Sequence, residues 1–219
     1  SDKLIVTHSL IPLPDDDGKD LVIEAQNDNK YWKNIEKVGL TGIIDHNKTN
    51  ILARMVGAID SDGHLQIGNE NTGLMRCIFY VGELEDYYDL CKDSLVLGFK
   101  KPTLLKTQNC YRVEGEVALG VLLMYLGACT GNKTQSIRKF PRWIHNMSTS
   151  VKREFLSGYH GGDGSKVVVN SSAVQQQTHI RGTRCRSTIE TLESHRDYLK
   201  NMSLLYGELG IETNITQYK

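Results

Sequence analysis

A chain of 219 residues can form one large domain or two small ones, because domains usually contain roughly 100 to 200 residues. Its 39% hydrophobic and 24% charged content is typical of a globular protein, and no apolar run approaches the ~20 residues of a membrane-spanning helix, which excludes a membrane protein. The formal net charge is zero, but residues 1–99 carry 17 Asp/Glu against 9 Lys/Arg, and residues 100–219 carry 9 against 17. A basic half suits a polyanionic partner, although charged runs are more often solvated surface.

The cysteines indicate neither a disulfide framework nor a zinc site, since they are odd in number, widely spaced and without a CxxC or Cys/His cluster. This favours a reducing compartment, so we expect an intracellular protein, with nucleus and cytoplasm not distinguished. The chain begins with serine and shows no secretory or transit signal, and we expect a trimmed piece of a longer protein. The five cysteines are Cys77, Cys91, Cys110, Cys129 and Cys185.

Residues 1–47 are expected to form an arm or linker without a core of its own. The apolar stretches LIVTHSLIPLP and LVIEA flank the acidic turn at Asp15–Gly18, which predicts a loose hairpin. The stretch NDNKYWKNIEKVGL predicts a short helix with Asn27 or Asp28 as its N-cap and Gly39 at its end.

Residues 48–135 are expected to form a first subdomain with the element order α-β-β-α-β-β-α. A helix over residues 50–60 is followed by two alternating strands, HLQIGN and LMRCIFYVG, and by the amphipathic helix ELEDYYDLCKDSLVLGF. A second hairpin, PTLLKTQNC and YRVEGEV, precedes the helix EVALGVLLMYLGA, which is apolar almost all round and therefore buried.

After a connector at residues 136–150, residues 151–219 repeat this order. The helix VKREFLSGYHG, the turn GGDG, the strand SKVVVNSS and a strand or loop at QQQTHIRGTRCRST lead to the helix ESHRDYLKNMSLLYGELGI. ETNITQYK is expected to be a third strand, and the chain stops before a fourth strand and a last helix. We therefore predict an α+β fold of two pseudo-symmetric subdomains, the second incomplete, with saddle-shaped antiparallel sheets.

Two short stretches occupy the same place in the two subdomains: MVGAIDSDG at Met55–Gly63 and LSGYHGGDG at Leu156–Gly164. They resemble the name-giving nonapeptide of the LAGLIDADG homing endonuclease family, in its two-motif, intein-associated form. The flanking stretches GNKT, FPRWI, KREFLSG and LLYGELGI also resemble intein endonucleases. The first copy agrees with the nonapeptide at Gly57, Ile59, Asp60, Asp62 and Gly63, and the second at Leu156, Gly158, Asp163 and Gly164.

Small residues on the two helices, Ala53 and Gly57 and then Ser157 and Gly158, would allow the helices to approach backbone to backbone. The acids at the two helix ends would then lie side by side, and two carboxylates so close repel each other unless divalent cations bridge them. We expect Mg²⁺, or Mn²⁺, to be the cofactor of a metal-assisted displacement by water at a phosphodiester. The expected metal ligands are Asp62 and Asp163, helped by the backbone carbonyls of Ser61 and Gly162.

The resemblance also implies a basic residue near the carboxylates. Lys133 is the best match, with Lys139 as the alternative, and no counterpart can be named for the second subdomain. Asp60 is expected to be mainly structural, and Gly161 stands where the second motif would have the equivalent acid.

The strands are expected to turn one face to the helices and the other to the major groove of double-stranded DNA. Five histidines, His46, His145, His160, His179 and His195, are expected to be surface or hydrogen-bonded residues. The candidates for the DNA-facing surface are His64, Gln66, Arg76, Lys106, Arg112, Lys166, Asn170, Arg181, Arg184 and Arg186.

The function favoured by these features is that of a sequence-specific DNA endonuclease, monomeric with internal pseudo-twofold symmetry, and the nuclease part of an intein. The first alternative is a catalytically inactive binder of the same fold, such as an RNA maturase or a DNA-binding regulator. A structural or protein-interaction domain is a third interpretation, and it predicts no salt-sensitive affinity for nucleic acid.

Overall fold

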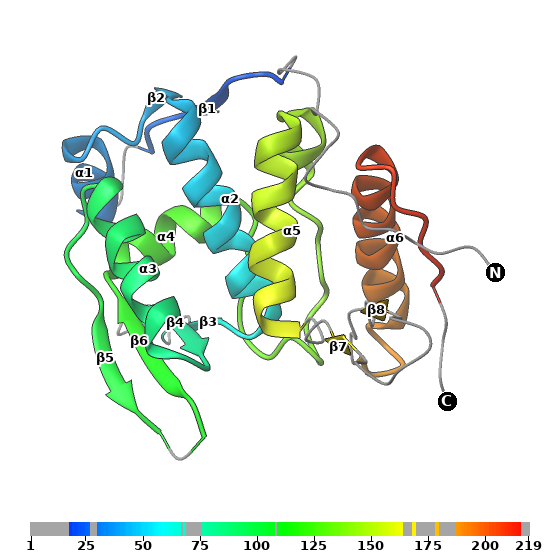
Figure 1. Ribbon diagram of the computed structural model, residues 1–219. Helices are drawn as coiled ribbons and strands as arrows, with labels where there is room; N and C mark the ends of the chain where they lie inside the picture. Colours follow the sequence, from blue (N-terminus) through cyan, green and yellow to red (C-terminus); the bar gives the residue numbers. More distant parts are fainter. Residues whose placement is uncertain are drawn as a thin grey trace.

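The computed structural model of the chain describes residues 18–26, 30–66, 68, 76–107, 109–163, 168–169, 178–179 and 187–215. Two long helices stand side by side at the centre, with the larger antiparallel sheet on one side and the last helix on the other (Figure 1). The predicted α+β fold class is confirmed. No helix in the described part of the chain is long and apolar enough to cross a membrane.

The central helices are α2 (His46–Ser61) and α5 (Thr149–Asp163), which run in the same direction (Figure 1). α2 begins before the predicted start at residue 50, because the side chain of Asp45 accepts a hydrogen bond of 2.9 Å from the backbone N–H of Lys48 and caps the first turn. α5 continues to Asp163, although the sequence predicts a turn that begins at Gly161. Its final turn packs directly against the end of α2, and this contact favours the helical form.

The first subdomain has the predicted element order. Its four strands form one antiparallel sheet in the order β3-β4-β6-β5, and α2, α3 and α4 all contact β4. Leu65, Phe79 and Val113 lie on the helix-facing side of this sheet and are buried in the core. The elements are β3 (His64–Gln66), β4 (Arg76–Val81), α3 (Leu84–Val96), β5 (Thr103–Lys106), β6 (Tyr111–Gly115) and α4 (Val117–Tyr125).

The N-terminal segment shares the core of the first subdomain. Strand β1 (Leu21–Ile23) pairs antiparallel with β2 (Gly42–Ile44), and α1 (Lys30–Lys37) packs against α4. The ring of Trp32 on α1 meets that of Tyr125 edge to face at 5.0 Å. The described partner of β1 is thus β2, while the apolar stretch expected to form a hairpin with it, within residues 4–14, lies outside the described residues.

The second subdomain begins after the 3-10 helix η1 (Arg142–Asn146). Its described elements follow the predicted order: α5, a short pair of strands formed by β7 (Val168–Val169) and β8 (Thr178–His179), and α6 (Leu192–Glu208). The predicted third strand does not form over residues 212–215, and residues 216–219 lie outside the described part. Strand pairing needs a neighbouring edge, and α6 is the element that precedes this stretch.

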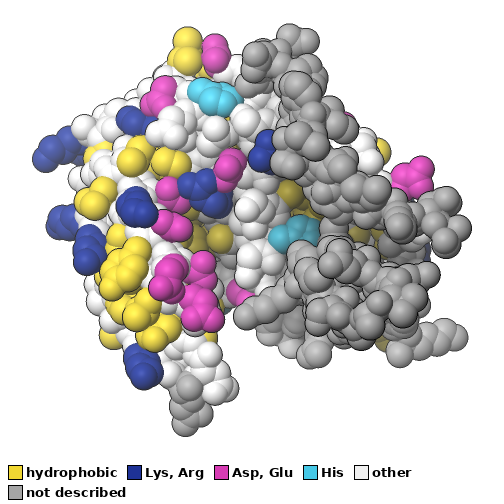
Figure 2. Space-filling model, viewed as in Figure 1, with side chains coloured by type: hydrophobic (Ala, Val, Ile, Leu, Met, Phe, Trp, Pro, Cys, Tyr) yellow, Lys and Arg dark blue, Asp and Glu magenta, His cyan; other side chains and the backbone are white. Residues whose placement is uncertain are grey.

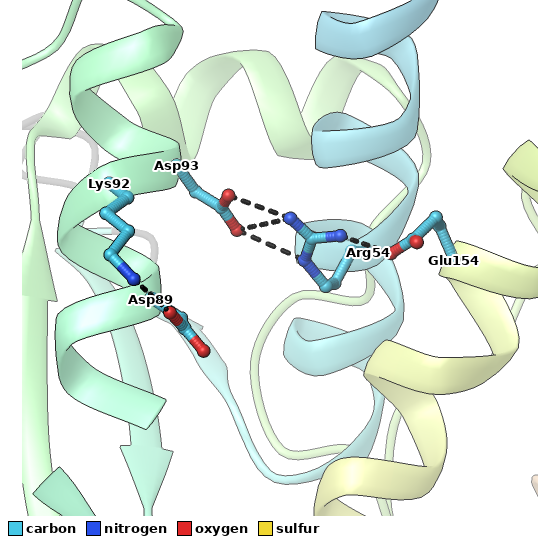
Figure 3. A network of polar contacts seen from close by, with 5 residues as sticks. All are labelled: Arg54, Asp89, Lys92, Asp93 and Glu154. Carbon is cyan, nitrogen blue, oxygen red and sulfur yellow. Dashed lines mark hydrogen bonds and ion pairs between the residues drawn. The ribbon is translucent and has the colours of Figure 1, made fainter. Parts of the chain in front are cut away.

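The three helices α2, α3 and α5 are joined by Arg54. Its guanidinium donates to both carboxylate oxygens of Asp93 on α3 at 2.8 Å and to the carboxylate of Glu154 on α5 (Figure 3). Burial raises the pKa of Asp93, and the bonds from Arg54 oppose that shift by stabilising the charged form. The Asp89–Lys92 pair nearby is exposed.

We expect Arg54→Leu to lower the free energy of unfolding by about 2 kcal/mol, because it leaves the buried Asp93 carboxylate without its cation. Urea unfolding measures this change, and Lys92→Ala, which breaks only the exposed pair, serves as a control with no measurable effect. Equal midpoints for the two variants would show that the Arg54 contacts are not stabilising.

The exposed side of α3 is acidic over its first two turns, whereas its later turns expose Lys92, Leu95 and Val96. Glu85, Asp86 and Asp89 are exposed in the first two turns, and acidic side chains gather in this region of the surface in Figure 2. Such a surface would repel a polyanion, so the opposite face of the sheet is the better candidate for contact with nucleic acid.

Candidate active site and nucleic-acid interface

The contact between α2 and α5 is made by two glycines in a reciprocal arrangement. A Cβ atom on Gly57 would lie 2.1 Å from the backbone oxygen of Phe155, and one on Gly158 would lie 2.0 Å from that of Arg54. Phe155 stands three residues before Gly158, and Arg54 stands three residues before Gly57. The helix pair is therefore locally twofold symmetric, and only glycine fits at either position without moving the backbones apart.

The same symmetry brings the two helix ends to one level. A Cβ atom on Gly162 would lie 2.4 Å from Oγ of Ser61 and 3.0 Å from Cβ of Asp62. Asp62 is exposed and caps α2 through its backbone N–H, which donates to Ala58. Asp163 is the last residue of α5, and its side chain lies outside the described part of the structure. The structure thus groups Ser61, Asp62, Gly162 and the backbone of Asp163.

Lys133 reaches the same place from the segment after α4. Its ammonium donates to the backbone oxygen of Ser61 at 2.5 Å, and this segment is anchored to β3 by a bond of 3.1 Å from the N–H of Gly131 to the oxygen of Leu65. The positive charge of Lys133 also helps burial to lower the pKa of His64. Lys139, the alternative candidate, is exposed.

Asp60 lies behind this group and is fully buried. Its carboxylate accepts bonds from the backbone N–H of Cys129 at 2.7 Å and from the hydroxyl of Tyr198 on α6 at 2.6 Å, while Arg138 donates to its backbone oxygen. Burial raises the pKa of Asp60, and these donors together with the charge of Arg138 act against that shift. Asp60 thus joins the end of α2 to both subdomains, and Gly161, at the equivalent place in α5, has open space around it.

The register of the sheet decides which candidates can face DNA. His64, Gln66, Arg76 and Arg112 lie on the face opposite the core, where Arg112 pairs with Glu114. The prediction that Lys106 shares this face is wrong: it is paired with Tyr111, so it lies on the same side as Leu104, which packs against the core. A strand alternates its faces, and a shift of one residue reverses the assignment. Lys166, Asn170, Arg181, Arg184 and Arg186 lie outside the described residues.

The donors present fit a divalent cation, because carboxylate and carbonyl oxygens are its preferred ligands. The Ser61 oxygen accepts a bond from Lys133 and keeps a second lone pair for a cation. No cluster of three or more His, Cys, Asp or Glu residues with metal-binding geometry occurs among the described residues. A site here would depend on the two acids and on backbone oxygens. Sequence reasoning missed Arg138 and Tyr198, for which no sequence pattern gave a signal.

No family model matches the chain. Among curated proteins, it is 27% identical to the replication factor C small subunit of Methanocaldococcus jannaschii, over 85% of this chain and 10% of that protein. It is 30% identical to the tRNA-splicing ligase RtcB of Pyrococcus furiosus, over 77% and 18%, and 24% identical to the RNA polymerase subunit Rpo1N of M. jannaschii, over 98% and 18%. The chain spans less than a fifth of the length of these relatives.

Among solved structures, I-DmoI in complex with DNA and Mn aligns with a TM-score of 0.51 at 14% identity, covering 79% of this chain and 85% of I-DmoI. A second I-DmoI structure, with nicked target DNA, also gives 0.51 at 12% identity, covering 80% and 84%. The chain has the fold of I-DmoI. At this level of identity the similarity concerns the fold alone.

Proposed function

We propose that the chain is a sequence-specific DNA endonuclease of LAGLIDADG type that makes a metal-dependent double-strand break, and that it is the nuclease part of an intein. The observation that carries the proposal is the reciprocal glycine contact of α2 and α5, because it sets Asp62 and the end of α5 at one place on a local twofold axis. A twofold arrangement suits an enzyme that addresses both strands of a duplex as a monomer. The fold of I-DmoI, solved with DNA and Mn, supports the proposal.

Asp62 and Asp163 would hold Mg²⁺ or Mn²⁺, with the carbonyl oxygens of Ser61 and Gly162 as further donors. A bound divalent ion supplies charge stabilisation at the phosphate and makes water a better nucleophile. Lys133 would stabilise the charge that develops on the phosphate, since its ammonium bonds to the backbone oxygen of Ser61, the residue before Asp62. The basic outer-face residues of the sheet would fix the duplex over this centre.

The intein part of the proposal is supported by the three curated relatives. These relatives are a replication factor, a tRNA-splicing ligase and an RNA polymerase subunit, which share no activity by name. The chain nevertheless matches a tenth to a fifth of the length of each relative. A segment inserted into different host proteins would give this pattern.

The proposal is tested with a randomised duplex library. Fragments retained by the protein in EDTA are sequenced, and the retained pool is then given Mg²⁺. A retained consensus that Mg²⁺ converts to cut fragments would support the endonuclease. Retention without cutting would favour the catalytically inactive binder. The absence of an acid equivalent to Asp60 at Gly161 is an argument for that alternative. Retention that does not fall with added salt would point to neither, since contacts to phosphates release counterions.

We expect Arg112→Gln to change the preferred base at one position of this consensus, because arginine pairs best with guanine and glutamine with adenine, with discrimination of about 1–3 kcal/mol. Lys106→Gln is the matched control, since its side chain belongs to the opposite face of the sheet and should leave the consensus unchanged. An identical consensus for wild type and Arg112→Gln would remove Arg112 from the reading surface.

A further inference from the structure

The segment that carries Lys133 rests on the first turn of α6 and on the residues just before it, which belong to the other subdomain. The backbone oxygen of Thr134 accepts bonds of 3.1 Å from the N–H of Thr188 and from the hydroxyl of Thr191. Further along, the N–H of Arg138 donates to the hydroxyl of Ser194 at 3.2 Å. The segment that carries Lys133 is therefore held in place by the start of α6 as well as by the helix pair.

His195 completes this platform at Lys133 itself. The ring is buried, with 3% of its surface exposed, and its Nε2 lies 2.8 Å from the backbone oxygen of Lys133. Its Nδ1 lies 2.8 Å from the backbone oxygen of Thr191, one turn earlier in the chain. Both neighbours are carbonyl oxygens, which can only accept. A neutral imidazole has one N–H and a protonated one has two, so the bond to Lys133 requires a proton on Nε2.

The two ends of Lys133 are thus fixed by different subdomains. Its backbone is held by His195 of the second, and its ammonium lies on the Ser61 oxygen at the end of α2 in the first. A lysine side chain has four rotatable bonds, so the position of its ammonium depends on how firmly its backbone is held.

We propose that His195 is a positioning residue: its hydrogen bond to the backbone oxygen of Lys133 places the ammonium at the Ser61–Asp62 end of α2. The second subdomain thereby controls the basic residue of the proposed active centre. The catalytic consequence rests on the proposed function. The hydrogen bond from His195 to Lys133, a tether between the two subdomains, can be tested without any cleavage.

The first readout is hydrogen exchange of the peptide at residues 131–138, which contains Lys133. His195→Leu is expected to speed its exchange several-fold, because loss of one buried hydrogen bond loosens the segment. His145→Leu is the matched control. It removes a bond of similar length, 2.9 Å to Asn201 on α6, that does not involve the backbone of Lys133. Exchange equal to wild type in His195→Leu would overturn the tether, whether or not the protein cuts DNA.

The second readout is a double-mutant cycle on single-turnover cleavage. His195→Leu is expected to slow cleavage about tenfold or more with unchanged DNA affinity, and to have no further effect in a Lys133→Ala background. His195→Gln, which keeps a donor, should recover most of the rate, and it replaces the leucine variant if that variant does not fold. Slowing by the same factor with and without Lys133 would overturn the positioning role. A wild type that never cuts would instead refute the proposed function, and hydrogen exchange would then decide the tether.

Discussion

Replacing Asp62 with asparagine is expected to lower metal-dependent cleavage by about a thousandfold or more, with DNA affinity nearly unchanged, because one of two carboxylates that would hold the metal is lost. Asp163→Asn should have the same effect, since the two residues occupy equivalent places on the twofold helix pair. Asp62 is exposed, and its backbone rather than its carboxylate caps α2, so the fold should not suffer.

The measurement is the single-turnover rate on the duplex selected from the library, with binding followed separately in EDTA. Asp45→Asn is the control for a lost charge, because Asp45 caps the opposite end of the same helix and asparagine caps equally well. Cleavage at the wild-type rate by Asp62→Asn would remove this residue from the active centre. A parallel loss of DNA binding would mean that its role is structural.

Gly158→Ala is expected to lower the free energy of unfolding by about 3 kcal/mol or more, because the added methyl group would overlap a backbone atom rather than a movable side chain. The new Cβ would lie 2.0 Å from the oxygen of Arg54 and 3.0 Å from the N–H nitrogen of Ala58. The helices could accept it only by separating, which would open the contact at Gly57, against which the buried residues Phe155 and Tyr159 lie. Gly57→Ala should behave alike, given the reciprocal contact with Phe155.

Gly161→Ala is the matched control, three residues further along the same helix. No atom lies within 4 Å of its new Cβ, and alanine is favoured over glycine in a helix by up to about 1 kcal/mol, so a small gain in stability is expected. Thermal or urea unfolding of the two variants gives the comparison. Equal stability of Gly158→Ala and Gly161→Ala would show that α2 and α5 do not pack backbone to backbone.

The parts of the fold that could be predicted from the sequence depend on local patterns. The helix pair followed from two motifs with a glycine at matching positions, Gly57 and Gly158, whereas the expectation that Ser157 lies at the contact is wrong, because its side chain is exposed. The α-β-β-α-β-β-α order of the first subdomain followed from periodicity and turn residues. The sequence prediction began this helix at residue 50, whereas α2 starts at His46 after the N-cap Asp45, a residue type that commonly caps helices.

The features that could not be predicted join residues far apart in the chain. β1 pairs with β2 across the whole of α1, and Asp60 bonds to Tyr198 on the last described helix. The tether from His195 to Lys133 is of the same kind. The prediction that Lys106 faces DNA failed for another reason. The face on which a strand residue lies depends on the strand register, which the sequence alone leaves uncertain by one residue.

We propose that α2 and α5 bring two acids together as one metal-dependent centre for both strands. Sequencing the ends that the protein creates in a DNA library with Mg²⁺ is the decisive test. The Asp62→Asn, Asp163→Asn double variant is run alongside. Recurrent cuts on the two strands at one fixed short offset, absent in the double variant, are expected. An intact library, or ends that recur equally with the double variant, would contradict the proposal.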